Sequence, residues 1–199
     1  MVYIDDVVKS FIKQFNIKEI KNYYVEIKTI YKKTLGEIRD LLFTFKKSRV
    51  DLLIPNVGTG FKRALYATYL SYLSKSKFSY TLNGHKDNRG TFYEILKTLD
   101  SGQFSLSTTA PGITRGNHYH HTKNEKFLVV RGKALIEFRH IITNDIVSYE
   151  VNDKNMEIVE MIPGYTHNIK NIGNEEMILL LWANETFDQN NPDTYFLEV

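Results

Sequence analysis

The hydrophobic pattern of the chain changes near residue 80, from helical spacing to strand-like alternation. Before that point, apolar residues recur every three or four positions, as on the buried face of an amphipathic helix. After it, short runs rich in Val, Ile, Phe and Thr are broken by Gly, Asn and Asp. The pattern predicts a mainly β fold, with a small helical segment over residues 1–78 and a β-domain over residues 79–199.

Three helices and one short strand are predicted in the first segment. Asp5 or Asp6 can cap the first helix, and Thr34 and Glu37 have the spacing of a capping box that starts the second. Residues 23–30 alternate as a short strand would. The expected buried faces are Val8, Phe11, Ile12 and Phe15; then Ile38, Leu41, Leu42 and Phe45; and, in a helix over 61–73, Leu65, Tyr69, Leu70 and Leu73.

About ten short strands are predicted from Tyr80 onward. Turn-forming groups such as Asn83-Gly84, Pro111-Gly112 and Arg131-Gly132 separate them at regular intervals. Regular alternation of short strands and turns is typical of a β-sandwich or β-barrel.

Composition narrows the possible partners and metal ligands. The 199 residues include no cysteine, so a metal must be held by nitrogen and oxygen atoms. Residues 1–80 carry 15 Lys and Arg against 7 Asp and Glu, but the lysines are scattered without an Arg cluster, and nucleic-acid binding is not expected. The first residues include Asp5 and Asp6 and no long apolar run, so we expect neither a signal peptide nor a membrane span, and a cytoplasmic protein.

A group of histidines and one glutamate points to metal chemistry. His118 and His120 would face the same side of a strand, and Glu125 follows after room for a tight turn. His167 lies in a second Gly-containing stretch. These residues could form a site with three nitrogens and one oxygen for Zn²⁺, Ni²⁺, Fe²⁺ or Mn²⁺. The alternative is that they are hydrogen-bonded polar groups of the barrel without metal.

The spacing of these residues resembles the two cupin motifs. Gly-x5-His-x-His-x4-Glu-x6-Gly is matched from Gly112 to Gly132, and the second motif is matched from Gly164 to Asn171. Pro163 directly precedes Gly164, where the motif places it two residues earlier. The resemblance implies a cupin barrel, in which His118, His120, Glu125 and His167 bind a divalent metal.

A second resemblance, to the dTDP-4-keto-6-deoxyhexose 3,5-epimerases, implies substrate contacts. It rests on Asp-Asn-Arg-Gly-Thr-Phe-Tyr-Glu, ending at Glu94, and on Arg-Gly-Asn-His, ending at His118. By position it implies that Arg89, Glu94 and Arg115 bind the nucleotide diphosphate or sugar, that His118 is the catalytic base, and that Lys126 stabilises an enolate. Both resemblances claim His118, which cannot be a metal ligand and a free base at once.

Nearly the whole chain is similar to the C-terminal part of the bifunctional capsular-polysaccharide UDP-2-acetamido-2,6-dideoxy-hexulose epimerase/reductase family. Segments that carry this resemblance include Val2-Tyr-Ile-Asp-Asp-Val-Val and Pro192-Asp-Thr-Tyr-Phe-Leu-Glu-Val. It implies C3 epimerisation of a UDP-linked 4-keto-6-deoxy-N-acetylhexosamine at a zinc cupin, on the route to UDP-N-acetyl-L-fucosamine. Residues 1–78 would correspond to the end of a short-chain dehydrogenase domain. The sequence has no Gly-rich dinucleotide loop, so a separate NADPH-dependent reductase is expected.

Two alternatives stay open: a non-catalytic sugar-nucleotide-binding cupin, and a metal-dependent oxygenase or isomerase of another small molecule. A homodimer is expected because the helical faces before residue 80 need covering. Tyr165, near His167, is expected to contact substrate, whereas Lys123 is expected to be solvated. Trp182 and Phe187 are expected to fill the barrel, and His85 and His140 to be surface or hydrogen-bonded residues.

Overall fold

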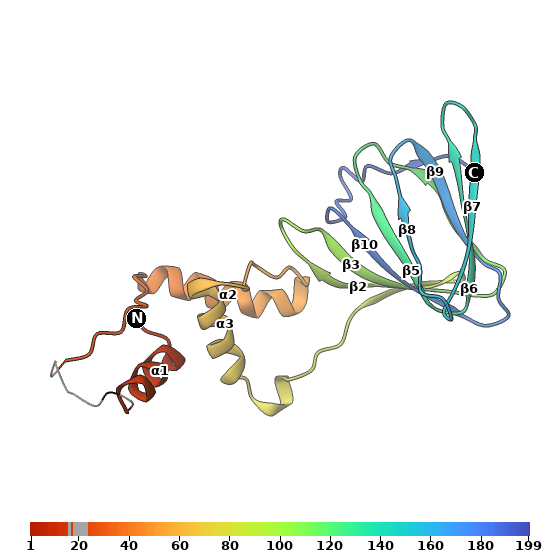
Figure 1. The fold of residues 1–199 in the computed structure, drawn as a ribbon. Helices are drawn as coiled ribbons and strands as arrows, with labels where there is room; N and C mark the ends of the chain where they lie inside the picture. Colours follow the sequence, from red (N-terminus) through yellow and green to blue (C-terminus); the bar gives the residue numbers. More distant parts are fainter. Residues whose placement is uncertain (16, 18–23) are drawn as a thin grey trace. The chain divides into compact units, whose positions relative to one another are not determined.

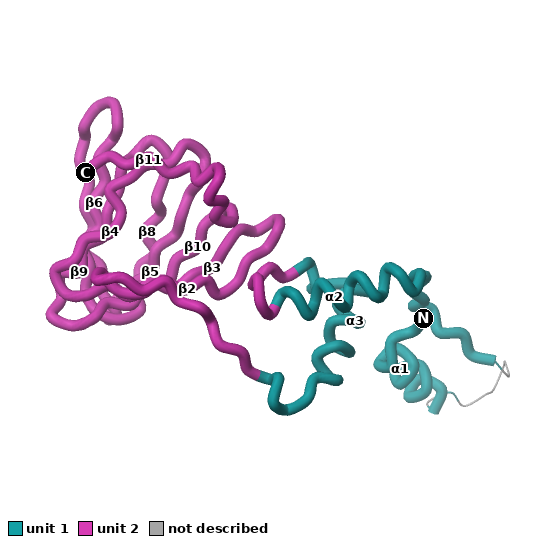
Figure 2. Tube along the Cα trace, turned by 180° about the vertical axis from the view of Figure 1, so that it is seen from behind, with its two compact units in different colours: residues 1–48, 55–78 teal, residues 49–54, 79–199 magenta. Residues whose placement is uncertain are grey.

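The computed structural model describes residues 1–15, 17 and 24–199. The chain forms two compact units, which Figure 2 distinguishes by colour. The helical unit comprises residues 1–48 and 55–78, and the barrel unit comprises residues 49–54 and 79–199. Residues 52–54 belong to the barrel unit because their backbone bonds to Lys97, with Ile54 N donating to Lys97 O at 2.9 Å.

The helical unit is organised around Phe45, whose side chain is fully buried. The ring of Phe45 contacts those of Tyr66 and Tyr69, with centroids 5.0 and 5.8 Å apart. The predicted capping box is confirmed, since Thr34 N donates to Glu37 Oε2 at 2.8 Å and Glu37 N donates to Thr34 Oγ1 at 3.2 Å. The helices are α1 (Ile4–Phe15), α2 (Leu35–Asp51), α3 (Gly60–Ser71) and the 3₁₀ turn η1 (Lys75–Lys77).

Three expectations for the helical unit are wrong. Helix α1 begins at Ile4, so Asp5 and Asp6 lie in its first turn rather than before it, and its apolar face is exposed, with Phe15 88% accessible. Residues 24–30 form no strand, and Tyr23, the first residue of that prediction, lies outside the described residues. Helical or strand-like spacing marks a face that is able to be buried, but tertiary partners decide whether it is.

The barrel unit is built from two antiparallel sheets that face each other (Figure 1). One has the strand order β1-β2-β3-β10-β5-β8 and the other β11-β4-β9-β6-β7. The prediction of a cupin-type, mainly β fold is confirmed. The strands are β1 (Gly84–Asp87), β2 (Gly90–Lys97), β3 (Gln103–Thr109), β4 (Thr114–Tyr119), β5 (Glu125–Arg131), β6 (Lys133–His140), β7 (Ile146–Asn152), β8 (Ile158–Met161), β9 (Tyr165–Asn171), β10 (Met177–Ala183) and β11 (Tyr195–Phe196).

The core lies between the two sheets and follows strand alternation. Its members are buried side chains from facing strands: Phe127, Val129, Ala134, Ile136, Phe138, Val151, Val159, Met161, Ile169, Met177 and Leu179. Strand β3 instead turns a polar row inward, with Gln103, Ser105 and Ser107 buried. The interior therefore combines an apolar core with a polar row along β3, and that row can contact a polar ligand. Within the described residues, no helix is long and apolar enough to cross a membrane.

Candidate metal centre and substrate cavity

His118 and His167 face each other across the pair β4–β9. The register places His118 opposite His167, after a bulge between Gly116 and His118. Gly116 has a φ of 98°, and a Cβ there would lie 2.7 Å from His167 O. Asn117, with a φ of 60°, is also in the left-handed region. This Gly-Asn bulge brings the two strands close and turns His118 toward His167.

The other two candidate ligands come from the end of β4 and the start of β5. His120 follows β4 and is 2% exposed, and Glu125 is the first residue of β5. Glu125 Oε2 lies 3.6 Å from His120 Nε2 and 3.6 Å from His167 Nε2. One donor atom from each of the four residues His118, His120, Glu125 and His167 lies within 4.8 Å of the others. The predicted convergence on one point of the cavity is what the structure shows.

This donor set fits a divalent cation. Bonds of about 2.0–2.2 Å in a tetrahedral site place ligand atoms about 3.4 Å apart, close to the 3.6 Å from Glu125 Oε2 to the Nε2 atoms of His120 and His167. The buried atoms His120 Nε2, His167 Nδ1 and His167 Nε2 have no hydrogen-bond partner within the described part of the chain. Buried polar atoms without partners are costly unless a ligand completes them. The observation favours a metal over histidines that are satisfied by hydrogen bonds.

The protonation states also suit metal binding. Burial, followed by the neighbouring imidazoles of His167 and His120, lowers the pKa of His118 from 6.5 to about 4. Burial raises the pKa of Glu125, but its interactions with His120 and His167 outweigh burial and leave that pKa below its usual range. At neutral pH His118 is therefore a neutral imidazole and Glu125 a carboxylate, the forms that bind metal.

The candidate ligands open into a cavity of about 660 Å³ inside the barrel. Polar and charged groups line it on several strands, including Arg89, Glu94, Gln103, Ser105, Ser107, Arg115, Lys123 and Glu185. Apolar side chains complete its walls: Phe92, Phe127, Ile169, Leu179 and Leu181. Its volume and mixed lining suit a ligand larger than a simple sugar.

The two predicted arginines lie together at this cavity with one carboxylate. Arg89 Nη2 is 2.6 Å from Asp87 Oδ2, and Arg115 Nη2 is 3.8 Å from Asp87 Oδ1. The hydrogen bond from Arg89 lowers the pKa of Asp87 to about 2. Burial lowers the pKa of Arg115, and Asp87 offsets part of that effect. Two cations against one anion leave this wall positive and able to bind an anionic group.

Glu94 reaches the cavity, whereas Lys126 and Tyr165 do not. Glu94 lines the cavity and forms an ion pair with Lys97, N to O 2.7 Å. Lys126 follows Glu125 on β5 and, by strand alternation, lies on the opposite face, where it pairs with Glu160. Tyr165 packs against the core and the ring of His140 at 4.8 Å.

Two further expectations require correction. Trp182 faces out of the barrel, and its Nε1 donates to Ser101 O at 2.9 Å, because Leu181 and Ala183 take the inward positions on β10. Phe187 lines the cavity and is 59% exposed instead of filling the barrel. His85 is exposed, as expected for a surface residue, and it also lines the cavity. His140 is hydrogen-bonded as expected, accepting from Thr143 N at 3.0 Å.

Lys123 is a buried charged residue of the cavity that the sequence analysis missed. Expected to be solvated, it is 7% exposed, and its Nζ donates to Thr194 Oγ1 at 2.7 Å and to Pro192 O at 3.1 Å. Lys123 precedes Glu125 by two positions, so continuing the inward parity of Glu125 backward from β5 would have indicated it.

Fold and site together define a cupin-like barrel with a metal-type centre. The chain belongs to the family described as polysaccharide biosynthesis C-terminal domain, whose family model matches residues 85–195. It is 49% identical over its whole length to UDP-2-acetamido-2,6-beta-L-arabino-hexul-4-ose reductase of Pseudomonas aeruginosa, and spans 54% of that relative, its C-terminal part.

Solved structures of the capsular polysaccharide assembling protein CapF are also similar to this chain over its whole length. The structure of CapF with the inhibitor 3-isopropenyl-tropolone is 49% identical with a TM-score of 0.94, over 100% of this chain and 57% of CapF. The structure of CapF from Staphylococcus aureus is 49% identical with a TM-score of 0.92, over 100% of this chain and 54% of CapF. The chain thus spans about half the length of these relatives, and corresponds to the C-terminal part of a capsular sugar-nucleotide-modifying enzyme.

Proposed function

We propose that this chain is a metal-dependent epimerase that acts at C3 of a UDP-linked 4-keto-6-deoxy-N-acetylhexosamine in capsular or O-antigen polysaccharide biosynthesis, in the cytoplasm. The observation that carries the proposal is the convergence of His118, His120, Glu125 and His167 inside a cavity that also holds Arg89 and Arg115. The relative from Pseudomonas aeruginosa supports the substrate class, since its name describes a reductase of a UDP-linked 4-keto sugar.

Arg89 and Arg115 are the proposed diphosphate contacts. A planar guanidinium can donate two parallel hydrogen bonds to a phosphate, and this wall of the cavity carries a net positive charge. Glu94 lies on the same strand as Phe92 and is proposed to contact the nucleoside or sugar. Tyr165 receives no substrate role, because it packs in the core.

The four ligand residues are proposed to hold Zn²⁺ beside the sugar. A divalent cation held there would act as a Lewis acid toward the C4 ketone and would so acidify the proton at C3. The protein contributes a fixed orientation of the keto sugar against that point, and a cavity with apolar walls in which electrostatic stabilisation is stronger than in water.

We assign His118 to the metal and not to proton transfer. Its place among the four converging donors, and a pKa lowered to about 4, make it a better ligand than a base at neutral pH. Lys126 lies outside the cavity, so Lys123 takes the role of the cation near the developing enolate. Proton transfer falls to the remaining titratable groups that line the cavity, which are His85, Glu94 and Glu185.

Reduction at C4 is proposed to be carried out by an NADPH-dependent reductase outside residues 1–199. No Gly-rich dinucleotide loop occurs in the sequence, and both sheets of the barrel are antiparallel, whereas dinucleotides bind at parallel sheets. The epimerised 4-keto sugar would be the product handed on.

The test is proton exchange at C3 in deuterated water. The chain, loaded with Zn²⁺ and incubated with the UDP-linked 4-keto-6-deoxy-N-acetylhexosamine, should exchange the C3 proton, seen as loss of its ¹H NMR signal. Single substitutions of His85, Glu94 and Glu185 to uncharged residues should identify the group that moves the proton. Binding of the sugar nucleotide without any exchange, with the metal bound, would instead show a binding protein without epimerase activity.

A further inference from the structure

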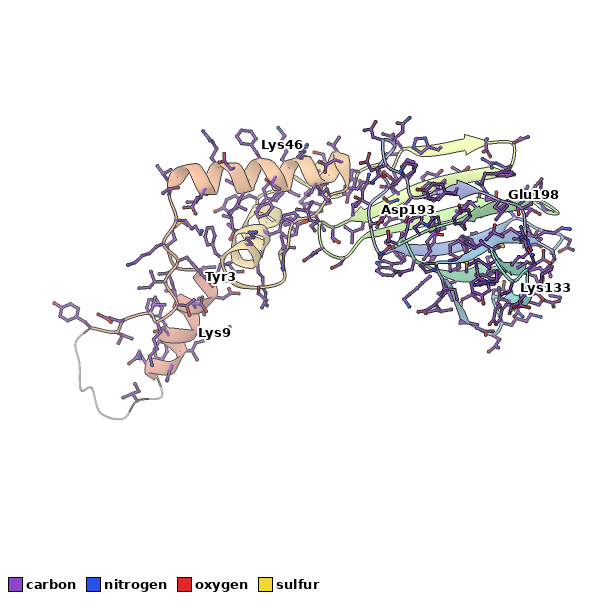
Figure 3. All side chains as sticks on the ribbon, turned by 90° about the horizontal axis from the view of Figure 1, so that it is seen from above. Tyr3, Lys9, Lys46, Lys133, Asp193 and Glu198 are labelled. Atoms are coloured by element: carbon purple, nitrogen blue, oxygen red, sulfur yellow. The ribbon has the colours of Figure 1, made fainter. Side chains whose placement is uncertain are left out.

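The last residues of the chain, 184–199, run along the cavity and contact the strand that carries His118; we call them the C-terminal strap. Glu185 and Phe187 line the cavity at the start of the strap. At its end, β11 pairs with β4 and places Phe196 opposite His118. Asp193 and Glu198, labelled in Figure 3, lie apart on the barrel. The strap therefore borders the cavity at its start and, near its end, pairs with the strand that carries His118.

The side chain of Asp193 accepts hydrogen bonds from the turn that joins the candidate ligands His120 and Glu125. Its Oδ1 accepts a hydrogen bond from His121 N at 2.9 Å. Its Oδ2 accepts from Thr122 N at 2.9 Å, from Lys123 N at 2.8 Å, and from Thr122 Oγ1 at 3.1 Å. One carboxylate thus satisfies three successive backbone amides of the 121–123 turn. Asp193 has a φ of 39°, an unusual conformation for a residue other than glycine, which persists only when surrounding contacts hold it.

The backbone carbonyl of Asp193 determines which ring nitrogen of His120 carries the proton. His120 Nδ1 lies 2.6 Å from Asp193 O, and a carbonyl oxygen can only accept a hydrogen bond. Nδ1 therefore carries the proton, and Nε2 keeps its lone pair. That Nε2 is buried, has no hydrogen-bond partner in the described chain, and lies 3.6 Å from Glu125 Oε2. An outer hydrogen bond of this kind sets the tautomer and ring orientation of a metal-binding histidine.

Lys123, in the turn, forms hydrogen bonds to the strap in the opposite direction. Its ammonium donates to the backbone of Pro192 and the hydroxyl of Thr194, the two neighbours of Asp193. The turn therefore holds the strap through Lys123 while the strap holds the turn through Asp193. Displacing either one removes hydrogen bonds from the other, so turn and strap should move as one unit.

We propose that Asp193 is a positioning residue for the metal centre, which holds His120 in the Nδ1–H tautomer and couples metal binding to docking of the C-terminal strap. The inference rests on the metal centre of the proposed function and adds its regulation by a distant segment of the chain. Because coupling between two sites is reciprocal, a bound cation should stabilise the docked strap by the factor by which the docked strap raises metal affinity.

The first test compares metal affinity in Asp193→Ala and Asp188→Ala, measured on the full chain by competition between Zn²⁺ and a chromophoric chelator. Asp188 is a matched control, an exposed aspartate of the same strap whose carboxylate accepts from Asn190 N at 2.9 Å. Asp193→Ala should weaken Zn²⁺ binding about 10- to 100-fold, the usual effect of losing an outer partner. Asp188→Ala should stay within about twofold of wild type. A folded Asp193→Ala variant with wild-type affinity would overturn the proposal.

A second test needs no substitution and no metal. Long-range ¹H–¹⁵N NMR of the metal-free wild-type chain should show His120 protonated at Nδ1 only, and the Nε2–H tautomer would refute the proposed hydrogen bond. Zn²⁺ should also slow proteolytic cleavage of the strap between residues 186 and 192, and an unchanged cleavage rate would refute the coupling. A wild-type chain that binds no Zn²⁺ would defeat the metal centre of the proposed function, whereas the tautomer measurement would still test the contact between Asp193 and His120.

Discussion

At the scale of single residues, the site depends on a few charges that face a common point. Glu125 is the one carboxylate among the four candidate ligands, and it lies 3.6 Å from two imidazole nitrogens. We expect Glu125→Gln to weaken Zn²⁺ binding at least 10-fold, because the anionic oxygen is lost while the side-chain volume is kept. Glu160→Gln, on the outer face beside Lys126, is the control and should bind Zn²⁺ like wild type. Equal affinities in the two variants would remove Glu125 from the metal site.

Lys123 and Lys126, which flank Glu125 in the sequence, lie on opposite sides of the sheet: Lys123 lines the cavity and Lys126 lies on the outer face. Lys123→Met should lower the rate of C3 exchange by about 10-fold or more, since a cation beside the developing enolate is lost. Lys126→Met should leave the rate unchanged, because that ammonium pairs with Glu160 outside the cavity. Exchange rates measured by ¹H NMR, with thermal unfolding as a check on folding, compare the two. A slower exchange in Lys126→Met than in Lys123→Met would instead assign enolate stabilisation to Lys126.

The pKa of His118 predicts how the metal-free chain responds to acid. Burial and the neighbouring imidazoles lower that pKa from 6.5 to about 4, so the unfolded chain binds the proton more readily than the folded chain between these values. Stability should therefore fall as the pH drops from 6.5 to 4, by an amount on the order of 3 kcal/mol from this residue. His118→Phe should lose less stability over the same range in urea unfolding. A wild-type curve that is flat over that range would contradict the buried, neutral imidazole.

At the scale of elements, the sequence was most informative where short-range spacing determines geometry. His118, His120 and Glu125 were predictable because strand alternation and a short turn set their directions. Lys126 was placed in the site by the epimerase resemblance, although strand alternation turns it to the face opposite Glu125. Lys123 was missed because it lies before β5, in a turn that Asp193 holds from 70 residues later, although the parity of Glu125 gives its direction. Helix α1 is a second case in which spacing alone was not enough. Its apolar residues recur at helical spacing, but the spacing does not say which segment would cover that face, and the face is exposed.

Helix α2 allows a direct test of a local signal. Thr34→Ala removes one half of the capping box, in which Glu37 N donates to Thr34 Oγ1 at 3.2 Å, and should cost about 1 kcal/mol. Hydrogen exchange of the amides of residues 35–38 should accelerate accordingly. Thr44→Ala is the control within the same helix, because its hydroxyl donates to Asp40 O inside the helix and alanine favours helix. Equal protection in both variants would argue against the cap as the stabilising feature.

At the scale of the whole molecule, the outer face of the six-stranded sheet is the surface that favours a homodimer. One row of cross-strand neighbours is apolar on five successive strands: Tyr93, Leu106, Leu180, Leu128 and Ile158. Ile158 is 59% exposed and the other four side chains are partly exposed, and a contiguous apolar row on a sheet surface favours an interface. Pairing of two such faces in a homodimer would cover both.

Light scattering tests the dimer. Wild type should have twice the mass of the chain, and Leu180→Lys should shift it toward monomer because a buried, unpaired ammonium is costly. Ile142→Lys is the control, since Ile142 is 78% exposed in the turn after β6. A wild-type monomer at micromolar concentration would require another explanation for the apolar row.

The measurement that tests the account most directly is X-ray absorption at the metal edge of the purified chain, combined with elemental analysis. We predict one divalent cation per chain, zinc by our proposal, bound by nitrogen and oxygen at about 2.0–2.2 Å with three imidazoles in the scattering pattern. His167→Ala should remove one imidazole from that pattern. A chain that takes up no stoichiometric cation, or a pattern that His167→Ala leaves unchanged, would contradict the account.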